Sequence, residues 1–212
     1  MQTNINDTII VSIDTKMETK LRIINRIDRK SGGVHIRQLA REANTSYNNA
    51  VRNIRILEKE NIVRRIKDAN LIKISLKDNP MTIAYLKKVH TEKYYNLPRR
   101  AILAVNELIK EIIPKPLICL IFGSYARGDY HKDSDIDLLL VFQNVQSSIN
   151  IERLAKAIGM RNNIVISPIY MNYKEYSTNF LNVEHDFSKE IRNDTIIVLG
   201  LEHYYELYWR IL

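Results

Sequence analysis

The chain of 212 residues and 24.9 kDa is long enough for one large or two small domains, each able to bury a core. Its composition, 45% hydrophobic and 26% charged, is that of an ordinary globular protein, and no apolar run approaches membrane-spanning length. The polar N-terminus lacks the order of a signal peptide, so we expect a cytoplasmic protein with no membrane partner. The single cysteine, Cys119, excludes an intramolecular disulfide and is expected to be a small buried hydrophobe.

The net charge of +8 is unevenly distributed along the chain. Residues 1–80 carry 16 Lys and Arg against 9 Asp and Glu, and residues 81–115 carry 7 against 3. Residues 116–212 instead carry 9 Lys and Arg against 12 Asp and Glu. Because the basic charge lies wholly in the first half, the sequence predicts a polyanion-binding front end joined to a different kind of domain.

Hydrophobic periodicity predicts three helices and a β-hairpin before residue 80. Apolar residues recur at the helical period and are interrupted by Gly and by good N-cap residues. Two β-like runs follow, joined by a turn with Asp and Asn. The expected elements are a short edge strand at 8–13, helices from about Lys16 to Ser31-Gly32-Gly33, at Ile36–Ala43 and at Tyr47–Asn61, and strands at Ile62–Ile66 and Leu71–Leu76, joined by Lys67-Asp68-Ala69-Asn70.

Three helices followed by a basic hairpin resemble the winged helix-turn-helix domain. The resemblance implies that the third helix enters the major groove of double-stranded DNA and that the wing contacts phosphate. It also makes a homodimer on paired half-sites plausible. The alternative is a three-helix module that packs against a partner protein, with its charges solvated. The DNA-contact candidates are Asn48, Asn49, Arg52, Asn53 and Arg55 on the third helix, and Arg64, Arg65 and Lys67 on the wing.

A helical connector is expected at residues 81–115, between Asp78-Asn79-Pro80 and Pro116. Pro98 predicts the start of a second helix within it. Its basic residues either extend the DNA surface or form the solvated face of a helix. They are Lys87, Lys88, Lys93, Arg99 and Arg100. The expected domains are therefore 1–80, 81–115 and 116–212.

The stretch from Leu117 to Phe142 carries the clearest chemistry in the chain. Six apolar residues, Leu117–Phe122, predict a buried strand, and a second apolar strand begins with Asp135 and Asp137. Residues two apart in a strand project to the same side, so the two carboxylates lie roughly 6–7 Å apart at their bases. Such neighbours repel unless a cation lies between them, and Mg²⁺ prefers oxygen ligands of this kind.

Between the two strands, Gly123 allows a tight turn and Ser124 offers a hydroxyl and a backbone N–H. A short helix starting at Ser124 would point free N–H groups at a phosphate. Arg127 and Ser134 are further nucleotide-binding candidates, although Arg127 could simply be solvated and Ser134 could cap the turn. Phosphate on one side and paired carboxylates on the other predict a metal–nucleotide site.

Phe122-Gly123-Ser124 followed by Asp135-Ile136-Asp137 resembles the signature of the DNA polymerase β-type nucleotidyltransferases, and GSYARGDYHKDSDIDLLL is similar to their minimal branch. The resemblance implies that Gly123 and Ser124 contact the triphosphate and that Asp135 and Asp137 are catalytic ligands of Mg²⁺. It implies transfer of a nucleoside monophosphate from a nucleoside triphosphate to an acceptor hydroxyl, with loss of pyrophosphate.

After Phe142 the pattern predicts further alternating elements, which complete an α+β fold with a mixed sheet and flanking helices. They are helices near Ile149–Ile158, Asn172–Asn179, Lys189–Arg192 and Glu202–Leu212, and strands at Asn163–Tyr170 and Thr195–Leu199.

Active members of this superfamily usually add a third carboxylate from a later strand, and the strand Asn163–Tyr170 has none. Ser167 stands at the matching place, while the nearby acids Glu175, Glu184 and Asp186 are not in an apolar strand. Three alternatives stay open: a DNA-binding nucleotidyltransferase, a transcriptional regulator that only binds nucleotide, and an antitoxin-like partner protein.

Overall fold

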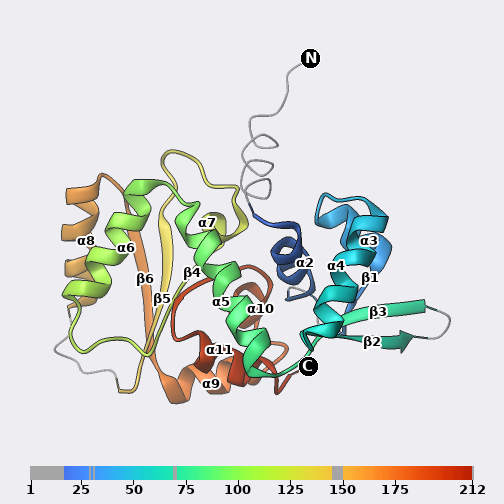
Figure 1. Ribbon diagram of the computed structural model, residues 1–212. Coiled ribbons are helices and arrows are strands. Elements are labelled where there is room, and N and C mark those ends of the chain that lie inside the picture. The colour runs from blue at the N-terminus through green and yellow to red at the C-terminus, as the bar shows by residue number, and fades with distance from the viewer. Residues whose placement is uncertain (1–16, 29, 31, 69–70, 145–149, 212) are drawn as a thin grey trace. The chain divides into compact units, whose positions relative to one another are not determined.

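The computed structural model describes residues 17–28, 30, 32–68, 71–144 and 150–211 (Figure 1). The edge strand expected at 8–13 lies outside the described residues. The chain forms two compact units, of which the first ends at Glu92 and the second begins at Lys93. The boundary falls inside helix α5 (Pro80–Tyr95), so the expected connector is divided between the two units.

The N-terminal unit combines three helices with a three-stranded antiparallel sheet of order β1-β3-β2. Its elements are α2 (Thr19–Asp28), β1 (Val34–His35), α3 (Ile36–Glu42), α4 (Tyr47–Lys59), β2 (Val63–Asp68) and β3 (Leu71–Leu76). The short strand β1 was not predicted, because Gly33 before it reads only as a helix stop. A Cβ on Gly33 would lie 2.9 Å from the carbonyl oxygen of Ile74, so glycine lets β1 approach β3.

Buried aliphatic side chains from all three helices form the core of this unit, among them Leu21, Leu39, Ile54 and Leu57. Ser46 caps α4, because its side chain accepts a hydrogen bond of 3.2 Å from the Asn49 backbone N–H. The N-cap chemistry of the sequence therefore starts the helix where it was predicted to start.

The C-terminal unit is built on a four-stranded mixed sheet of order β6-β5-β4-β7, as the sequence predicted. Strand β4 is antiparallel to β5 and to β7, whereas β5 and β6 are parallel. The strands are β4 (Ile118–Phe122), β5 (Ile136–Phe142), β6 (Ile166–Asn172) and β7 (Ile196–Leu199). Strand β6 begins later than expected, because Asn163 adopts a left-handed conformation (φ 50°) as the C-cap of α8.

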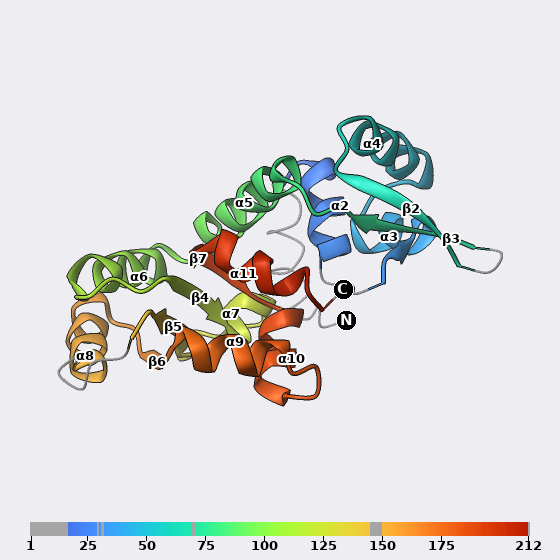
Figure 2. The same ribbon diagram turned by 90° about the horizontal axis from the view of Figure 1, so that it is seen from below.

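Helices cover both faces of this sheet, and Figure 2 shows α6 and α8 on one side and α9 and α11 on the other. They are α6 (Arg99–Glu111), α8 (Ile151–Asn162), α9 (Tyr173–Leu181), α10 (Asp186–Asn193) and α11 (Leu201–Tyr208). The core between the sheet and α6 includes Ile121, Leu138 and Leu108. Cys119 is fully buried there, and burial raises the pKa of its thiol to about 12, so it is the small hydrophobe that the sequence predicted.

In the described part of the chain, no helix combines the length and the apolar character needed to cross a membrane.

Candidate active site

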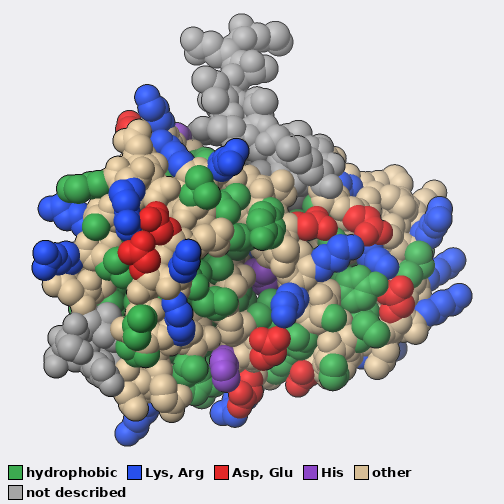
Figure 3. Space-filling view, turned by 60° about the vertical axis from the view of Figure 1, so that its left-hand side comes forward, with side chains coloured by type: hydrophobic (Ala, Val, Ile, Leu, Met, Phe, Trp, Pro, Cys, Tyr) green, Lys and Arg blue, Asp and Glu red, His purple; other side chains and the backbone are tan. Residues whose placement is uncertain are grey.

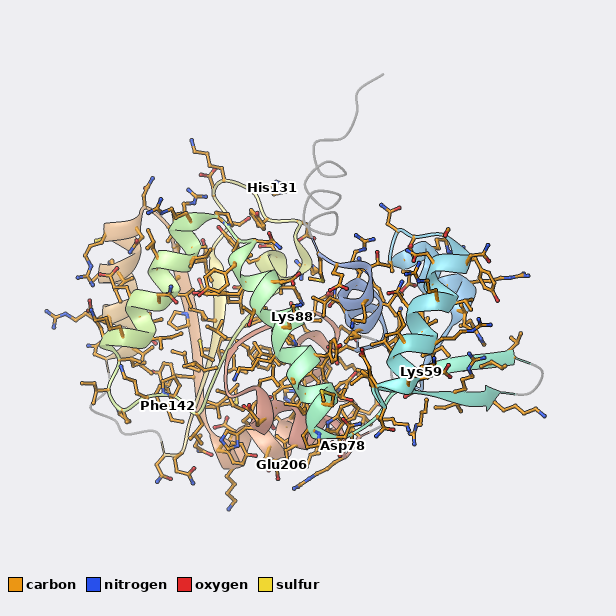
Figure 4. All side chains as sticks on the ribbon, viewed as in Figure 1. Lys59, Asp78, Lys88, His131, Phe142 and Glu206 are labelled. Carbon is orange, nitrogen blue, oxygen red and sulfur yellow. The ribbon has the colours of Figure 1, made fainter. Side chains whose placement is uncertain are left out.

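The Gly-Ser turn and the acidic strand meet at one end of the C-terminal sheet. Strand β4 leads directly into the short helix α7 (Gly123–Arg127), and Phe122 pairs in register with Asp137. Gly123 has φ +65°, and a Cβ there would lie 2.2 Å from Asp137 Oδ2. The carboxylate therefore packs directly on the Gly123 backbone, which only glycine allows. In Figure 4, the labelled His131 marks the loop at this end of the sheet, and Phe142 marks the other end of β5.

Asp135 and Asp137 flank Ile136, which is buried in the core as predicted. The neighbouring strand β6 places Ser167 opposite Asp137, and Ser167 Oγ donates a hydrogen bond of 3.1 Å to Asp135 Oδ2. The two carboxylates are thus supported by β4 on one side and by β6 on the other. The sequence prediction that the pair lies next to the Gly123 turn agrees with this geometry.

The electrostatics of the pair favour a cation. Burial raises the pKa of the Asp137 carboxyl, the charges of Asp135 and Glu190 raise it further, and Arg127 opposes the shift. Two carboxylates with mutual repulsion suit Mg²⁺, and a nucleotide-bound ion would take its other ligands from phosphate oxygens and water. Among the described residues, no group of three or more His, Cys, Asp or Glu side chains is arranged to hold a metal. The residues present therefore fit an ion that arrives with a triphosphate.

Glu190 is the acid that sequence reasoning missed. Its Oε1 lies 3.5 Å from Arg127 Nη1, while Arg127 Nε lies 3.2 Å from Asp129 Oδ2. Helix α10 reaches the site because the ring of Phe187, one turn before Glu190, packs edge-on against Phe122 with centroids 5.3 Å apart. No motif marks this acid, and the only signal is an aromatic residue and an acid three positions apart on one face of α10.

The acids that the sequence considered as substitutes for a third carboxylate lie elsewhere. Glu184 and Asp186 are 83% and 98% exposed and both pair with Lys189, and the exposed Glu175 begins α9. Ser167 occupies the place beside Asp137 on β6, where the third carboxylate was expected.

The two serine candidates have different environments. Ser124 is half-buried in α7, and its carbonyl oxygen accepts the Gly128 N–H that ends the helix. Ser134 Oγ accepts the His131 N–H at 2.8 Å, so it caps the turn before β5. That contact is the structural alternative left open by the sequence, although Ser134 also lines the adjacent cleft.

A cleft of about 1090 Å³ opens at this end of the sheet. It lies on the side of Ser167, and its walls come from α6, the 128–134 loop, α8 and β6. Its volume is at the upper end of ordinary small-molecule sites. Arg100, which the sequence assigned to a connector, is part of the wall. The lining residues are Arg100, Phe122, Lys132, Asp133, Ser134, Asp137, Glu152, Ala155, Lys156, Gly159, Met160, Asn163, Ile164, Val165, Ile166, Ser167, Pro168 and Ile169.

In the N-terminal unit, the predicted DNA-contact residues of α4 fall into two groups. Asn48, Arg52, Arg55 and Lys59 are exposed on one face, at spacings of four, three and four residues. Lys59 is labelled in Figure 4. They line a shallow hollow of about 480 Å³ with Val51 and Ile56. Asn49 and Asn53 instead bond within the helix, since Asn53 Nδ2 donates to Asn49 Oδ1 at 3.1 Å.

The predicted wing residues Arg64, Arg65 and Lys67 are all exposed on β2. Arg65 makes a bidentate pair with Glu58 of α4, with Nε–Oε1 and Nη2–Oε2 distances of 2.6 and 3.0 Å. Arg64 and Lys67 keep their charges on the surface. On the face shown in Figure 3, basic and acidic side chains are interspersed, so the net charge alone does not define a binding surface.

Comparison with known proteins assigns the C-terminal unit. Residues 102–198 match the family model described as "Nucleotidyltransferase domain". The chain is also 32% identical over 90 residues to a Methanocaldococcus jannaschii protein named "Putative protein adenylyltransferase". That match covers 41% of this chain and 87% of the archaeal protein. The Gly123 turn and the Asp135–Asp137 pair lie inside the matched region, and this chain belongs to the nucleotidyltransferase family.

Proposed function

We propose that the C-terminal unit transfers a nucleoside monophosphate from a nucleoside triphosphate to an acceptor hydroxyl, with release of pyrophosphate. The observation that carries this proposal is the packing of the Asp137 carboxylate on the Gly123 backbone, next to Asp135. The name of the archaeal relative favours ATP as the donor and a protein hydroxyl as the acceptor.

Each residue of the proposed site has a defined task. Gly123 and Ser124 bind the triphosphate, and Arg127 adds positive charge beside it. Asp135 and Asp137 would hold Mg²⁺, which when bound neutralises charge on the phosphates. The acceptor oxygen forms a bond to the α-phosphorus, the bond to the bridging oxygen breaks, and pyrophosphate leaves. The acceptor enters from the cleft on the Ser167 side.

A second candidate function follows from Ser167 in place of a third carboxylate. Losing one acid weakens an acceptor-side metal more than a nucleotide-bound one, because the latter keeps the phosphate oxygens. On this reading the unit binds Mg²⁺–nucleotide without turnover, as a regulator or an antitoxin-like partner protein. Retained binding without transfer is its signature.

Metal removal distinguishes these functions. With ATP labelled at the α-phosphate, we expect label on a protein acceptor, or slow release of labelled AMP when water is the acceptor. ATP labelled at the γ-phosphate should give labelled pyrophosphate and no labelled acceptor. EDTA should stop both, and excess Mg²⁺ should restore them. Nucleotide binding without transfer favours the regulator, and failure to bind any Mg²⁺–nucleotide refutes both.

We also propose that the N-terminal unit is a winged helix-turn-helix that binds double-stranded DNA as a homodimer. The supporting observation is the exposed face of α4 with Asn48, Arg52, Arg55 and Lys59, flanked by Arg64 and Lys67 on β2. Because Asn49 and Asn53 bond within α4, we assign base contact to Asn48 and Arg52 rather than to those two.

Replacing Arg55 with alanine is expected to weaken binding to a 20-base-pair duplex of random sequence. If Arg55 contacts one phosphate, the slope of log affinity against log salt falls by about 0.9. Fluorescence anisotropy at several salt concentrations measures this slope. Lys110→Ala, which removes an exposed charge from α6, should leave the slope unchanged. Equal slopes for Arg55→Ala and the unaltered protein would contradict the assignment.

A further inference from the structure

Tyr125 has a polar group that the fold does not use. It is the third residue of α7, between the Gly123 turn and Arg127, and its side chain is 1% exposed. Its ring stacks on Tyr130 with centroids 4.5 Å apart and an interplanar angle of 5°. Within the described part of the chain, the buried Oη has no hydrogen-bond partner. A buried hydroxyl left unpaired costs about 1–3 kcal/mol, and phenylalanine would fill the same space without that cost.

Two charged groups flank this hydroxyl. Burial raises the pKa of the Tyr125 phenol, the nearby Arg100 guanidinium lowers it, and the Asp135 carboxylate raises it. Arg100 lies in the first turn of α6, and its Nη2 donates to the Lys132 carbonyl oxygen at 2.6 Å. The phenol therefore lies between a cation of the cleft wall and one member of the acidic pair.

The chemistry of the two neighbours fixes the direction of any hydrogen bond. A guanidinium only donates, so toward Arg100 the phenol oxygen can only accept. Its proton must then point elsewhere, and the acceptor on the other side is the Asp135 carboxylate, which only accepts when ionised. Asp135 Oδ2 already accepts from Ser167 Oγ, so a second donor would fix both the position and the rotation of this carboxylate.

We propose that Tyr125 is a positioning residue for Asp135, donating its hydroxyl proton to that carboxylate when the metal–nucleotide is bound. The proposal rests on the proposed function, because it gives a task to a group beside the metal ligands. Ser167 and Tyr125 then hold Asp135 from two sides. Outer partners that orient a metal ligand typically contribute 10–100-fold to metal affinity or activity.

The test compares two variants of the same aromatic stack, Tyr125→Phe and Tyr130→Phe. Each variant removes one hydroxyl and keeps both rings, so packing is matched. Mn²⁺ is titrated into the full chain in the presence of a non-hydrolysable ATP analogue, and bound metal is followed by electron paramagnetic resonance. We expect Tyr125→Phe to bind Mn²⁺ at least 10-fold more weakly and to melt at the same or a higher temperature than the unaltered protein. Tyr130→Phe should match the unaltered protein in metal affinity.

The outcomes separate this proposal from the function on which it rests. If the unaltered protein binds Mn²⁺ with the analogue but Tyr125→Phe binds it equally well, the positioning role is refuted and the nucleotide site stands. A lower melting temperature of Tyr125→Phe with unchanged metal affinity shows a purely structural hydroxyl and also refutes it. If the unaltered protein binds no metal–nucleotide, the proposed function fails and this proposal fails with it.

Discussion

Replacing Gly123 with alanine is expected to lower nucleotidyl transfer by at least about 100-fold, the loss that a misplacement of about 1 Å can cause. The new Cβ would lie 2.2 Å from Asp137 Oδ2 and 3.1 Å from its Cγ, so the carboxylate must move away from Asp135. Alanine at φ +65° also adds roughly 1–2 kcal/mol of backbone strain to the folded state. Transfer of the α-phosphate label measures the first effect, and urea unfolding measures the second.

Gly32→Ala is the matched control for backbone strain. Gly32 has φ +84°, but a Cβ there would have no heavy atom within 4 Å. This variant should therefore lose a similar free energy of unfolding and keep its transfer activity. If Gly123→Ala transfers label as fast as Gly32→Ala, the contact between Gly123 and Asp137 has no role in the reaction.

Asp137→Asn is expected to lower transfer by at least about 100-fold and, without Mg²⁺, to make the folded protein more stable at pH 7. The activity is lost because an amide is a poorer ligand for Mg²⁺ than a carboxylate. The stability rises because burial and the charges of Asp135 and Glu190 disfavour the ionised Asp137. Catalytic carboxylates held against their own electrostatic preference commonly show this trade-off.

The pH dependence of the Asp137→Asn effect follows from the raised pKa of Asp137. The folded protein holds the Asp137 proton more tightly than the unfolded chain, so ionised Asp137 lowers the free energy of unfolding once the pH exceeds its folded pKa. The stability gain in Asp137→Asn should therefore be small at pH 3 and larger at pH 7, as measured by urea unfolding in EDTA. Asp129→Asn, which removes an exposed carboxylate from the same loop, should show no gain. A loss of stability at pH 7 in Asp137→Asn would contradict the electrostatic argument.

The local parts of this protein were predictable from its sequence. The apolar alternation around Ile136, the N-cap at Ser46 and the glycine at position 123 each act through residues close in the chain, so their patterns are visible without a structure. The mixed sheet followed from strand-like runs separated by helical ones. Boundaries moved by a few residues where caps such as Asn163 ended a helix late.

The remaining parts of the site depend on contacts between distant residues. Glu190 reaches Arg127 only because Phe187 docks on Phe122, and nothing in the sequence near either aromatic residue marks that contact. Tyr125 reads as an ordinary core residue until the position of Arg100 is known. The cleft could not be predicted for the same reason, since its walls come from four separate segments.

The parallel pairing of β5 with β6 has a consequence for when the acidic pair becomes competent. Asp135 and Ser167 are 32 residues apart, and their bond can form only after the whole crossover through α8 has closed. Contacts over such separations form late, because chain closure must be paid for before they stabilise anything. A nascent or partly unfolded chain thus holds both aspartates without their shared support, and the maturity of the domain itself controls access to its chemistry.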